Sequence, residues 1–391
     1  MGVESRMSLK NRLSVQLPNA LRFLPSPLKG LTRILFDTLV LAGTPRREGS
    51  GEVGAIFLLH GLGDLIIGAP SVEALSESLH RRGLKSRLFV CQKNVRFAKA
   101  YIDVDEVVGL DWLQFAHSVI YRARVLRALA SGGEYQVAYQ PTVNRRLEVE
   151  DSLIRATGAR DRIGLWGTDI FIKPFERYLG DRFYTCLVKT SALDQHDRLS
   201  FQDFLSALAA PPPPQTWSPL PEPSSLTPQS PYLVISSQAS TPLKEWPLER
   251  FLEVARSLAG PRGWQILVVG WPDDSKLAPD LLDFRGRTDT AELAGVLNGA
   301  QLLLTNDSGP LHLGMALSVP TVAVAGGGLP GRYFPYPDHT RYPVRILEVP
   351  APCAGCGWKC HRPQPASGAA WCVSEVTTDR VYRAAEELLA N

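Results

Sequence analysis

Residues 302–312 read Leu-Leu-Leu-Thr-Asn-Asp-Ser-Gly-Pro-Leu-His, a sequence that indicates a strand, a polar loop and the start of a helix. Its three leucines make a short continuous apolar run, as expected of a strand that is buried on both faces. Small polar residues then lead to Pro310, and proline is favoured in the first turn of a helix, where its missing N–H is not needed. A buried strand that runs through a polar loop into a helix is the repeating unit of a parallel α/β sheet.

The same order of strand, polar loop and helix recurs along the chain. A helical pattern spans residues 69–82, and a second helix is expected to open at Trp246-Pro247 and to end at Gly260. Strands that alternate with helices predict parallel sheets, in which ligands bind outside the carboxyl ends of the strands. The expected strands are 54–59, 86–91, 104–110 and 136–140 in the first half and 232–236, 265–269, 302–305 and 321–325 in the second.

A proline-rich segment divides the chain. Residues 211–231 contain nine prolines in 21 residues, which fits neither a helix interior nor a central strand and predicts a stiff linker. The chain on each side is long enough to bury its own core. We therefore expect a basic N-terminal arm at 1–50, an α/β domain at 51–210, the linker at 211–231 and a second α/β domain at 232–391.

Charge and hydropathy narrow the class of partner. The net charge is +3, but residues 1–50 carry +5 and the remainder −2, so there is no basic stripe for a nucleic acid along the body of the protein. The sequence contains no run of 18 apolar residues, so no transmembrane helix is predicted. The first ten residues lack the apolar region of a secretory signal. These features predict a cytoplasmic location.

Residues 21–41 mix leucines with Arg22, Lys29 and Arg33 at a helical period. One interpretation is a basic amphipathic helix that rests on the anionic face of the inner membrane. The alternative is a helix packed on its own domain. The sequence leaves both open.

A first candidate site follows the strand at 54–59, where His60-Gly61-Leu62-Gly63-Asp64 forms a strand-to-helix turn. Glycines allow a tight bend and close approach of a ligand. The dinucleotide fingerprint is absent, because Ile66 stands where its third glycine is needed. Asp64 could cap the helix or act as a general base on an alcohol.

Two polar loops of the second half form the other candidate sites. Ser240 and Lys244 lie between a strand end and a helix start, a place that suits a phosphate, although Lys244 could equally be a solvated surface charge. Within residues 302–312, Asp307, Ser308 and Gly309 precede a helix. The N–H groups at the start of that helix could bind an anion, or Asp307 and Ser308 could simply cap them. His312 could pack against its surroundings or take part in catalysis. Residues 326–328, three glycines, would let the backbone approach a ligand closely.

The motifs in their order resemble the family 9 glycosyltransferases, which are ADP-heptose:lipopolysaccharide heptosyltransferases. The resemblance rests on Gly63-Asp64, on Lys244-Glu-Trp-Pro-x-x-Arg-Phe251 and above all on Thr305-Asn-Asp-Ser-Gly-Pro-Leu-His312, and it runs in order from about residue 53 to residue 390. The chain departs from the family at Leu58, where an arginine is usual, and at His60, where a glycine is usual.

This resemblance implies a GT-B fold, with two facing Rossmann-like domains and a cleft between an acceptor domain (51–210) and a donor domain (232–391). It also implies an inverting transfer that needs no metal for the sugar step, with Asp64 as the general base. The nucleotide-sugar donor would be ADP-heptose or a related compound, and Thr288 would lie where the family holds adenine. The implied donor-binding residues are Gly63, Ser240, Lys244, Thr288, Asp307, Ser308, Gly309 and His312.

Four of the six cysteines lie within one loop, at residues 352–373. Cys353, Cys356, Cys360 and Cys372 could supply a tetrahedral thiolate site, for which zinc is expected ahead of iron, and free thiols are the alternative. A protein-modifying branch of the resembled family also has a metal-holding loop. The resemblance implies a lipopolysaccharide-type glycan as the acceptor, and the cysteine loop favours the alternative, a protein of the autotransporter type. A second alternative is a non-catalytic protein that binds sugar nucleotides or assists assembly.

Overall fold

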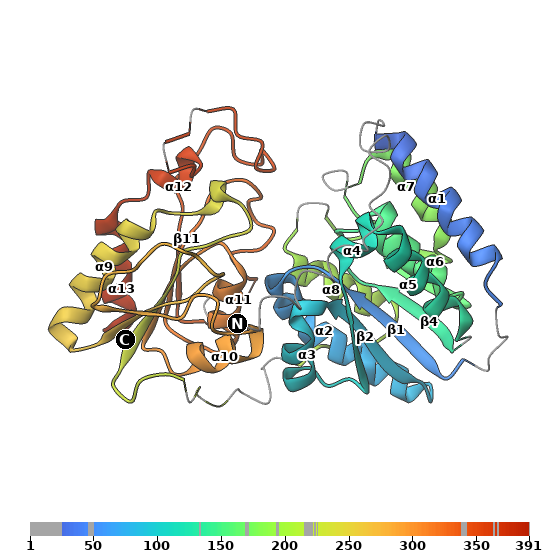
Figure 1. Ribbon diagram of the computed structural model, residues 1–391, viewed down its shortest axis with the longest axis horizontal. Coiled ribbons are helices and arrows are strands. Elements are labelled where there is room, and N and C mark those ends of the chain that lie inside the picture. Colours follow the sequence, from blue (N-terminus) through green and yellow to red (C-terminus); the bar gives the residue numbers. More distant parts are fainter. Residues whose placement is uncertain are drawn as a thin grey trace, which may run out of the picture.

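The computed structural model describes residues 26–45, 51–132, 134–168, 172–192, 195–214, 222, 224, 226–337, 342–362, 364–365 and 367–390. Two α/β halves lie side by side, the first in blue to green and the second in yellow to red (Figure 1). Each half contains one six-stranded sheet, and every strand pairing within the two sheets is parallel. The predicted class, parallel α/β in two halves, is confirmed.

The first sheet has the strand order β3-β2-β1-β4-β5-β6. Its strands are β1 (Val53–Leu58), β2 (Lys85–Cys91), β3 (Glu106–Leu110), β4 (Tyr135–Gln140), β5 (Asp161–Leu165) and β6 (Cys186–Val188). The accompanying helices are α1 (Ser26–Ala42), α2 (Leu62–Arg81), α3 (Val95–Tyr101), α4 (Trp112–His117), α5 (Val119–Ser131), α6 (Ser152–Ala156), α7 (Pro174–Gly180) and α8 (Asp197–Ala207). Every residue of the central strand β1 is buried, as its continuous apolar sequence predicts.

The second sheet has the strand order β12-β11-β10-β7-β8-β9. Its strands are β7 (Tyr232–Ser236), β8 (Gln265–Val268), β9 (Leu281–Asp283), β10 (Leu302–Asn306), β11 (Thr321–Val324) and β12 (Val344–Leu347). The helices are α9 (Leu248–Arg262), α10 (Thr290–Asn298), α11 (Gly309–Ala316), α12 (Trp371–Ser374) and α13 (Thr378–Leu389). Residues 302–312 are thus β10, the loop after it and the first half of α11.

Helix α9 does not end where the sequence suggested. It continues through Gly260 and Pro261 to Arg262, and Gly263 terminates it with φ of 64°. A left-handed residue after the last turn closes a helix, and glycine adopts that conformation without steric cost. Gly260 was therefore the wrong glycine. Pro247 is the N-cap of this helix and lies just outside its first turn.

The N-terminal helix α1 is docked on the first half, and Figure 1 shows it on the side away from the second half. Its Asp37 carboxylate accepts two hydrogen bonds of 2.6 Å from the Arg122 guanidinium of α5, and both side chains are buried. The packed-helix interpretation is correct for this face. The opposite face leaves Leu31, Leu35 and Leu39 exposed, by 42%, 61% and 66%. Residues 21–25 of the candidate membrane segment lie outside the described residues.

No helix in the described ranges is long and apolar enough to cross a membrane. The described residues of the proline-rich linker, 211–214, 222, 224 and 226–231, form neither helix nor strand.

The two halves meet through helices that begin at their sheet edges. Helix α2 of the first half packs against α11 of the second, and α3 contacts α10. At the edge of this contact Arg96 pairs with Asp289 at 2.6 Å and with Glu292 at 2.9 Å. These contacts bring the carboxyl ends of β1 and β10 to one cleft.

Candidate functional site

One cleft of about 540 Å³ between the two halves collects the predicted chemistry. Its walls come from the loops after β1, β7, β8 and β10 and from the start of α10. All nine residues expected at the catalytic and donor site line it, namely Gly63, Asp64, Ser240, Lys244, Thr288, Asp307, Ser308, Gly309 and His312. The structure therefore brings together side chains that are up to about 250 positions apart in the sequence.

Asp64 lies in the first turn of α2, directly after the carboxyl end of β1. One of its carboxylate oxygens accepts a 3.2 Å hydrogen bond from the Gly61 backbone N–H, so the side chain closes the start of the helix. The capping interpretation is therefore realised, and it does not exclude the other, because the carboxylate also lines the cleft. The cap holds the carboxylate at the amino end of a helix, where negative charge is stabilised.

His312 faces Gly63 across the junction of the two halves. A Cβ added to Gly63 would lie 2.7 Å from a carbon of the imidazole, so only glycine allows this approach. Burial, followed by the charges of nearby His196 and Lys244, lowers the pKa of His312 to about 3. The ring is therefore neutral near pH 7, and its Nδ1 lies 3.1 Å from the Tyr336 hydroxyl. His312 is a packed histidine that also lines the cleft.

Lys244 is no solvated surface charge. It is only 9% exposed, and its ammonium donates a 2.6 Å hydrogen bond to the Asp307 carboxylate. Asn306 ties the two loops together, because its side-chain oxygen accepts from the Trp246 N–H at 3.0 Å and its amide donates to the Ser237 carbonyl at 2.5 Å. A rigid pair of loops thus holds one cation at the cleft.

Helix α11 starts at this same place. Ser308 is its N-cap, with Gly309 and Pro310 in the first turn, and the Ser308 side chain makes no capping hydrogen bond. The free N–H groups and positive end of a helix attract an anion. Together with the ammonium of Lys244, they make this wall of the cleft a suitable place for a diphosphate.

Several cleft residues were missed from the sequence. Trp271 follows β8 and is 55% exposed, and Tyr333 comes from an irregular segment of the second half. A signal existed for Trp271, since an aromatic residue directly after a buried strand stands at the ligand edge of the sheet. No local pattern marks Tyr333. The remaining residues missed are Lys93, Val269, Gly270, Asp289, Thr290 and Leu293.

A polar network joins the halves beside Asp64. Arg332 of the second half donates to the Asn144 side-chain oxygen at 2.8 Å and lies 3.2 Å from the Asp197 carboxylate. The His196 ring bonds to the Tyr333 carbonyl at 2.9 Å. Burial raises the pKa of Asp197 to about 7, with the charge of Asp64 adding to the effect and Arg332 opposing it. His196-Asp197 is thus part of the contact between the halves.

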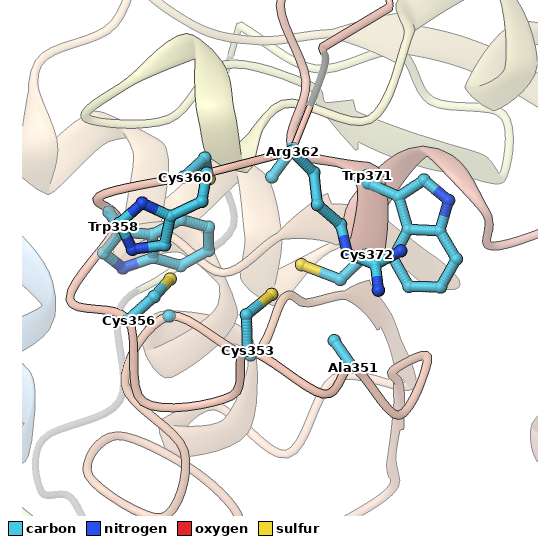
Figure 2. A pocket seen from close by; sticks show the side chains of 12 residues that line it. Ala351, Cys353, Cys356, Trp358, Cys360, Arg362, Trp371 and Cys372 are labelled. Carbon is cyan, nitrogen blue, oxygen red and sulfur yellow. The ribbon is translucent and has the colours of Figure 1, made fainter.

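The cysteine segment lies beside this site rather than in it. Cys353, Cys356, Cys360 and Cys372 line one small pocket of about 20 Å³ (Figure 2). All four are free thiols, and burial, together with the neighbouring cysteines, raises the pKa of Cys360. Within the described residues, no group of three or more His, Cys, Asp or Glu side chains is already arranged to hold a metal ion. The four thiols are suitable metal ligands, but they are not arranged around a common metal position.

The triglycine at 326–328 serves the cysteine segment. The carbonyls of Gly327 and Gly328 accept hydrogen bonds from the N–H groups of Gly355 and Gly357 at 2.8 and 2.9 Å. A Cβ on Gly328 would overlap the Trp358 indole. The expected close approach is real, but its partner is Trp358 of the same chain rather than a bound ligand.

Comparisons with known proteins agree with this geometry. Residues 193–354 match the family model described as Glycosyltransferase family 9 (heptosyltransferase). Lipopolysaccharide heptosyltransferase 2 of Salmonella typhimurium is 25% identical over a segment that covers 27% of this chain and 33% of that protein. Over these segments the chain is similar to the family 9 heptosyltransferases. The aligned segment spans about a third of the length of the curated relatives.

Solved structures of a heptosyltransferase and of another glycosyltransferase extend the likeness in fold to most of the chain. Escherichia coli heptosyltransferase WaaC with ADP superposes with a TM-score of 0.60 at 18% identity, covering 86% of this chain and 99% of that one. The iron-containing dodecameric glycosyltransferase TibC of enterotoxigenic E. coli has a TM-score of 0.50 at 16% identity, covering 88% and 77%. Identities this low concern the fold alone, and the expected GT-B arrangement of two facing Rossmann-like domains is confirmed.

Proposed function

We propose that this protein is an inverting glycosyltransferase that moves a heptose from ADP-heptose to a hydroxyl of a lipopolysaccharide-type glycan. One observation carries the proposal: the cleft places the Asp64 carboxylate of the first half opposite the Lys244 ammonium and the α11 N-terminus of the second. A base on one wall and an anion site on the other are the two parts that transfer from a nucleotide diphosphate sugar requires.

In the proposed reaction, the acceptor oxygen attacks the anomeric carbon of the sugar as the bond from that carbon to the diphosphate oxygen breaks. The proton of the acceptor hydroxyl passes to the Asp64 carboxylate, and ADP leaves with the bonding electrons. Attack on the face opposite the leaving group inverts the anomeric centre. Lys244 and the N–H groups at the start of α11 stabilise the charge that develops on the diphosphate.

The donor assignment is supported by the family match, and the adenine would lie near Thr288 at the start of α10. The assay is release of ADP from ADP-heptose by the purified protein, with a UDP-sugar in a parallel reaction. ADP release on addition of an acceptor extract supports the assignment. Turnover of the UDP-sugar, with ADP-heptose neither bound nor consumed, contradicts it.

The acceptor is proposed as a glycan, and a protein acceptor is the alternative, which the cysteine segment favours. Mass spectrometry of candidate acceptors after co-expression separates the two. An added heptose mass on the lipid-linked glycan supports the first proposal, and the same mass on a protein supports the alternative.

We further propose that the four cysteines of residues 352–373 hold one structural metal ion, zinc ahead of iron, with no part in the transfer step. Four thiols on one pocket supply the donor set of a tetrahedral site, although the thiols would have to turn toward a common centre. Elemental analysis identifies the metal. Cys353→Ser should lose it and Cys186→Ser, at an exposed cysteine outside the segment, should retain it. Full metal content in Cys353→Ser would rule out the site.

The exposed leucines of α1 support a proposed peripheral contact with an anionic membrane. The preceding basic sequence at residues 1–25 would add electrostatic attraction. Co-sedimentation with anionic vesicles should fall for Leu35→Glu and persist for Leu226→Glu, a leucine exposed elsewhere. Equal sedimentation of the two variants argues against α1 as the contact.

A further inference from the structure

Lys244 has an aromatic neighbour that comes from the cysteine segment. Its ammonium lies 5.0 Å from the centre of the Trp358 ring and 5.8 Å from that of Tyr333, besides its 2.6 Å contact with Asp307. An ammonium within about 6 Å of an aromatic ring is attracted to the ring's electron-rich face, and tryptophan attracts it most strongly. The cation at the cleft is thus held by one carboxylate and two rings.

Trp358 is placed there by an unusual backbone. Its φ of 63° lies in the left-handed region, which is unfavourable for a side chain of this size. The flanking turn is fixed by the hydrogen bonds of Gly355 and Gly357 to the triglycine, and the absence of side chains at Gly326 and Gly328 makes room for the indole. Figure 2 shows Trp358 between Cys356 and Cys360.

The indole is held by its face rather than by its polar edge. Trp358 Nε1 is buried and finds no hydrogen-bond partner among the described residues. A buried donor without a partner is costly, so the position is maintained by other contacts. Those contacts include the two glycines, the ammonium of Lys244 and the hydrophobic core of the second half.

We propose that Trp358 is a positioning residue for Lys244, by which the cysteine segment sets the affinity of the donor site for the diphosphate of a nucleotide. The inference rests on the proposed function, in which Lys244 binds that diphosphate. Trp358 does not line the cleft itself and would act only through the lysine. The cysteine segment would thereby help to position Lys244 in the donor site, in addition to its part in the fold.

The test is a double-mutant cycle on ADP affinity, measured by titration calorimetry of the full chain. Trp358→Leu should weaken ADP binding by roughly 3- to 30-fold, the range of a partly desolvated cation–π contact, and Trp358→Phe should weaken it less. In a Lys244→Ala background, Trp358→Leu should have no further effect. Trp371→Leu, at a tryptophan of the same pocket, is the matched control and should bind ADP as the unsubstituted chain does.

Two outcomes would overturn the proposal. One is an equal loss in the Lys244→Ala background, which would mean that Trp358 acts independently of the lysine. The other is full ADP affinity in a Trp358→Leu protein that melts as the unsubstituted chain does.

A second measurement needs no nucleotide and so separates this inference from the proposed function. With lysine labelled at Cε, the Lys244 signal, identified by its absence in Lys244→Ala, should be shifted upfield by the indole ring. The shift should disappear in Trp358→Leu and remain in Trp371→Leu. A signal that does not move in Trp358→Leu overturns the positioning role even if the chain binds no ADP, whereas failure to bind ADP alone would count only against the proposed function.

Discussion

The ammonium of Lys244 lies 2.6 Å from a carboxylate oxygen of Asp307, and both side chains are buried at the wall of the cleft. The pair keeps a positive charge in place where a solvated lysine would be mobile. It also means that a diphosphate must share the ammonium with a carboxylate. Substitution of Lys244 alone and substitution of Lys244 together with Asp307 should therefore affect the free energy of unfolding and donor binding differently.

Lys244→Met should lower both the free energy of unfolding and the affinity for ADP. It leaves the Asp307 carboxylate buried without its cation, at a cost of about 3–5 kcal/mol in the free energy of unfolding. It should also weaken ADP binding by roughly 10- to 100-fold, as expected for a charged hydrogen bond. Denaturant unfolding and calorimetry measure the two effects.

The double variant Lys244→Met/Asp307→Asn is the control for that experiment. It removes both charges, so most of the lost stability should return while the ADP affinity stays low. Recovery of ADP binding together with stability would show that the lysine matters only to the fold.

His312 should make the free energy of unfolding depend on pH. Its pKa of about 3 in the folded protein lies below the value of about 6.5 expected when the chain is unfolded. Between these values the unfolded chain binds one more proton, so stability is fully present above pH 6.5 and falls as the pH drops toward 3, by about 1.4 kcal/mol per pH unit. Burial, His196 and Lys244 lower the pKa of His312, and Asp64 opposes them.

The measurement is the free energy of unfolding between pH 4 and pH 6 for the unsubstituted chain and for His312→Gln. The variant should lose a slope equivalent to about one proton. Identical slopes would mean that His312 takes up its proton in the folded protein as readily as in the unfolded chain.

The buried pair that anchors α1 should be essential to the first domain. Arg122→Met removes the partner of Asp37, which is held by two 2.6 Å hydrogen bonds, and should cost about 3–5 kcal/mol in unfolding free energy. Leu35→Gln, on the exposed face of the same helix, should change it by about 0.5 kcal/mol or less. If Arg122→Met unfolds like the unsubstituted chain, α1 contributes little to the domain.

Much of the fold followed from local sequence because the buried strands are continuous apolar runs. Strand β7 has the predicted bounds, and β2, β4, β8, β10 and β11 differ by one residue at one end. Strands β5, β6, β9 and β12 were missed. The last three are short strands at the sheet edges, where no long apolar run is needed, and the internal strand β5 begins with the charged Asp161 and Arg162. The terminus of α9 was misplaced because Gly260 and Gly263 are alike in sequence and only the second has a positive φ.

The candidate site was predictable where chemistry follows directly after a strand. Asp307 follows β10 directly, and Asp64 and Lys244 lie on the segments that leave the carboxyl ends of β1 and β7. Tyr333 and Trp358 do not, because irregular segments bring them to Lys244 through tertiary contacts alone. The triglycine was recognised as a place of close approach, but no local rule could name the indole as its partner.

We propose that Asp64 takes the acceptor proton while the opposite wall of the cleft holds the donor. Asp64→Asn keeps an oxygen that can accept from the Gly61 N–H, so the start of α2 should stay closed. The most direct measurement is heptose transfer and ADP affinity on this one variant. We expect transfer to fall by roughly 10²- to 10⁴-fold with ADP affinity and melting temperature unchanged. Transfer at the unsubstituted rate would mean that Asp64 is not the base.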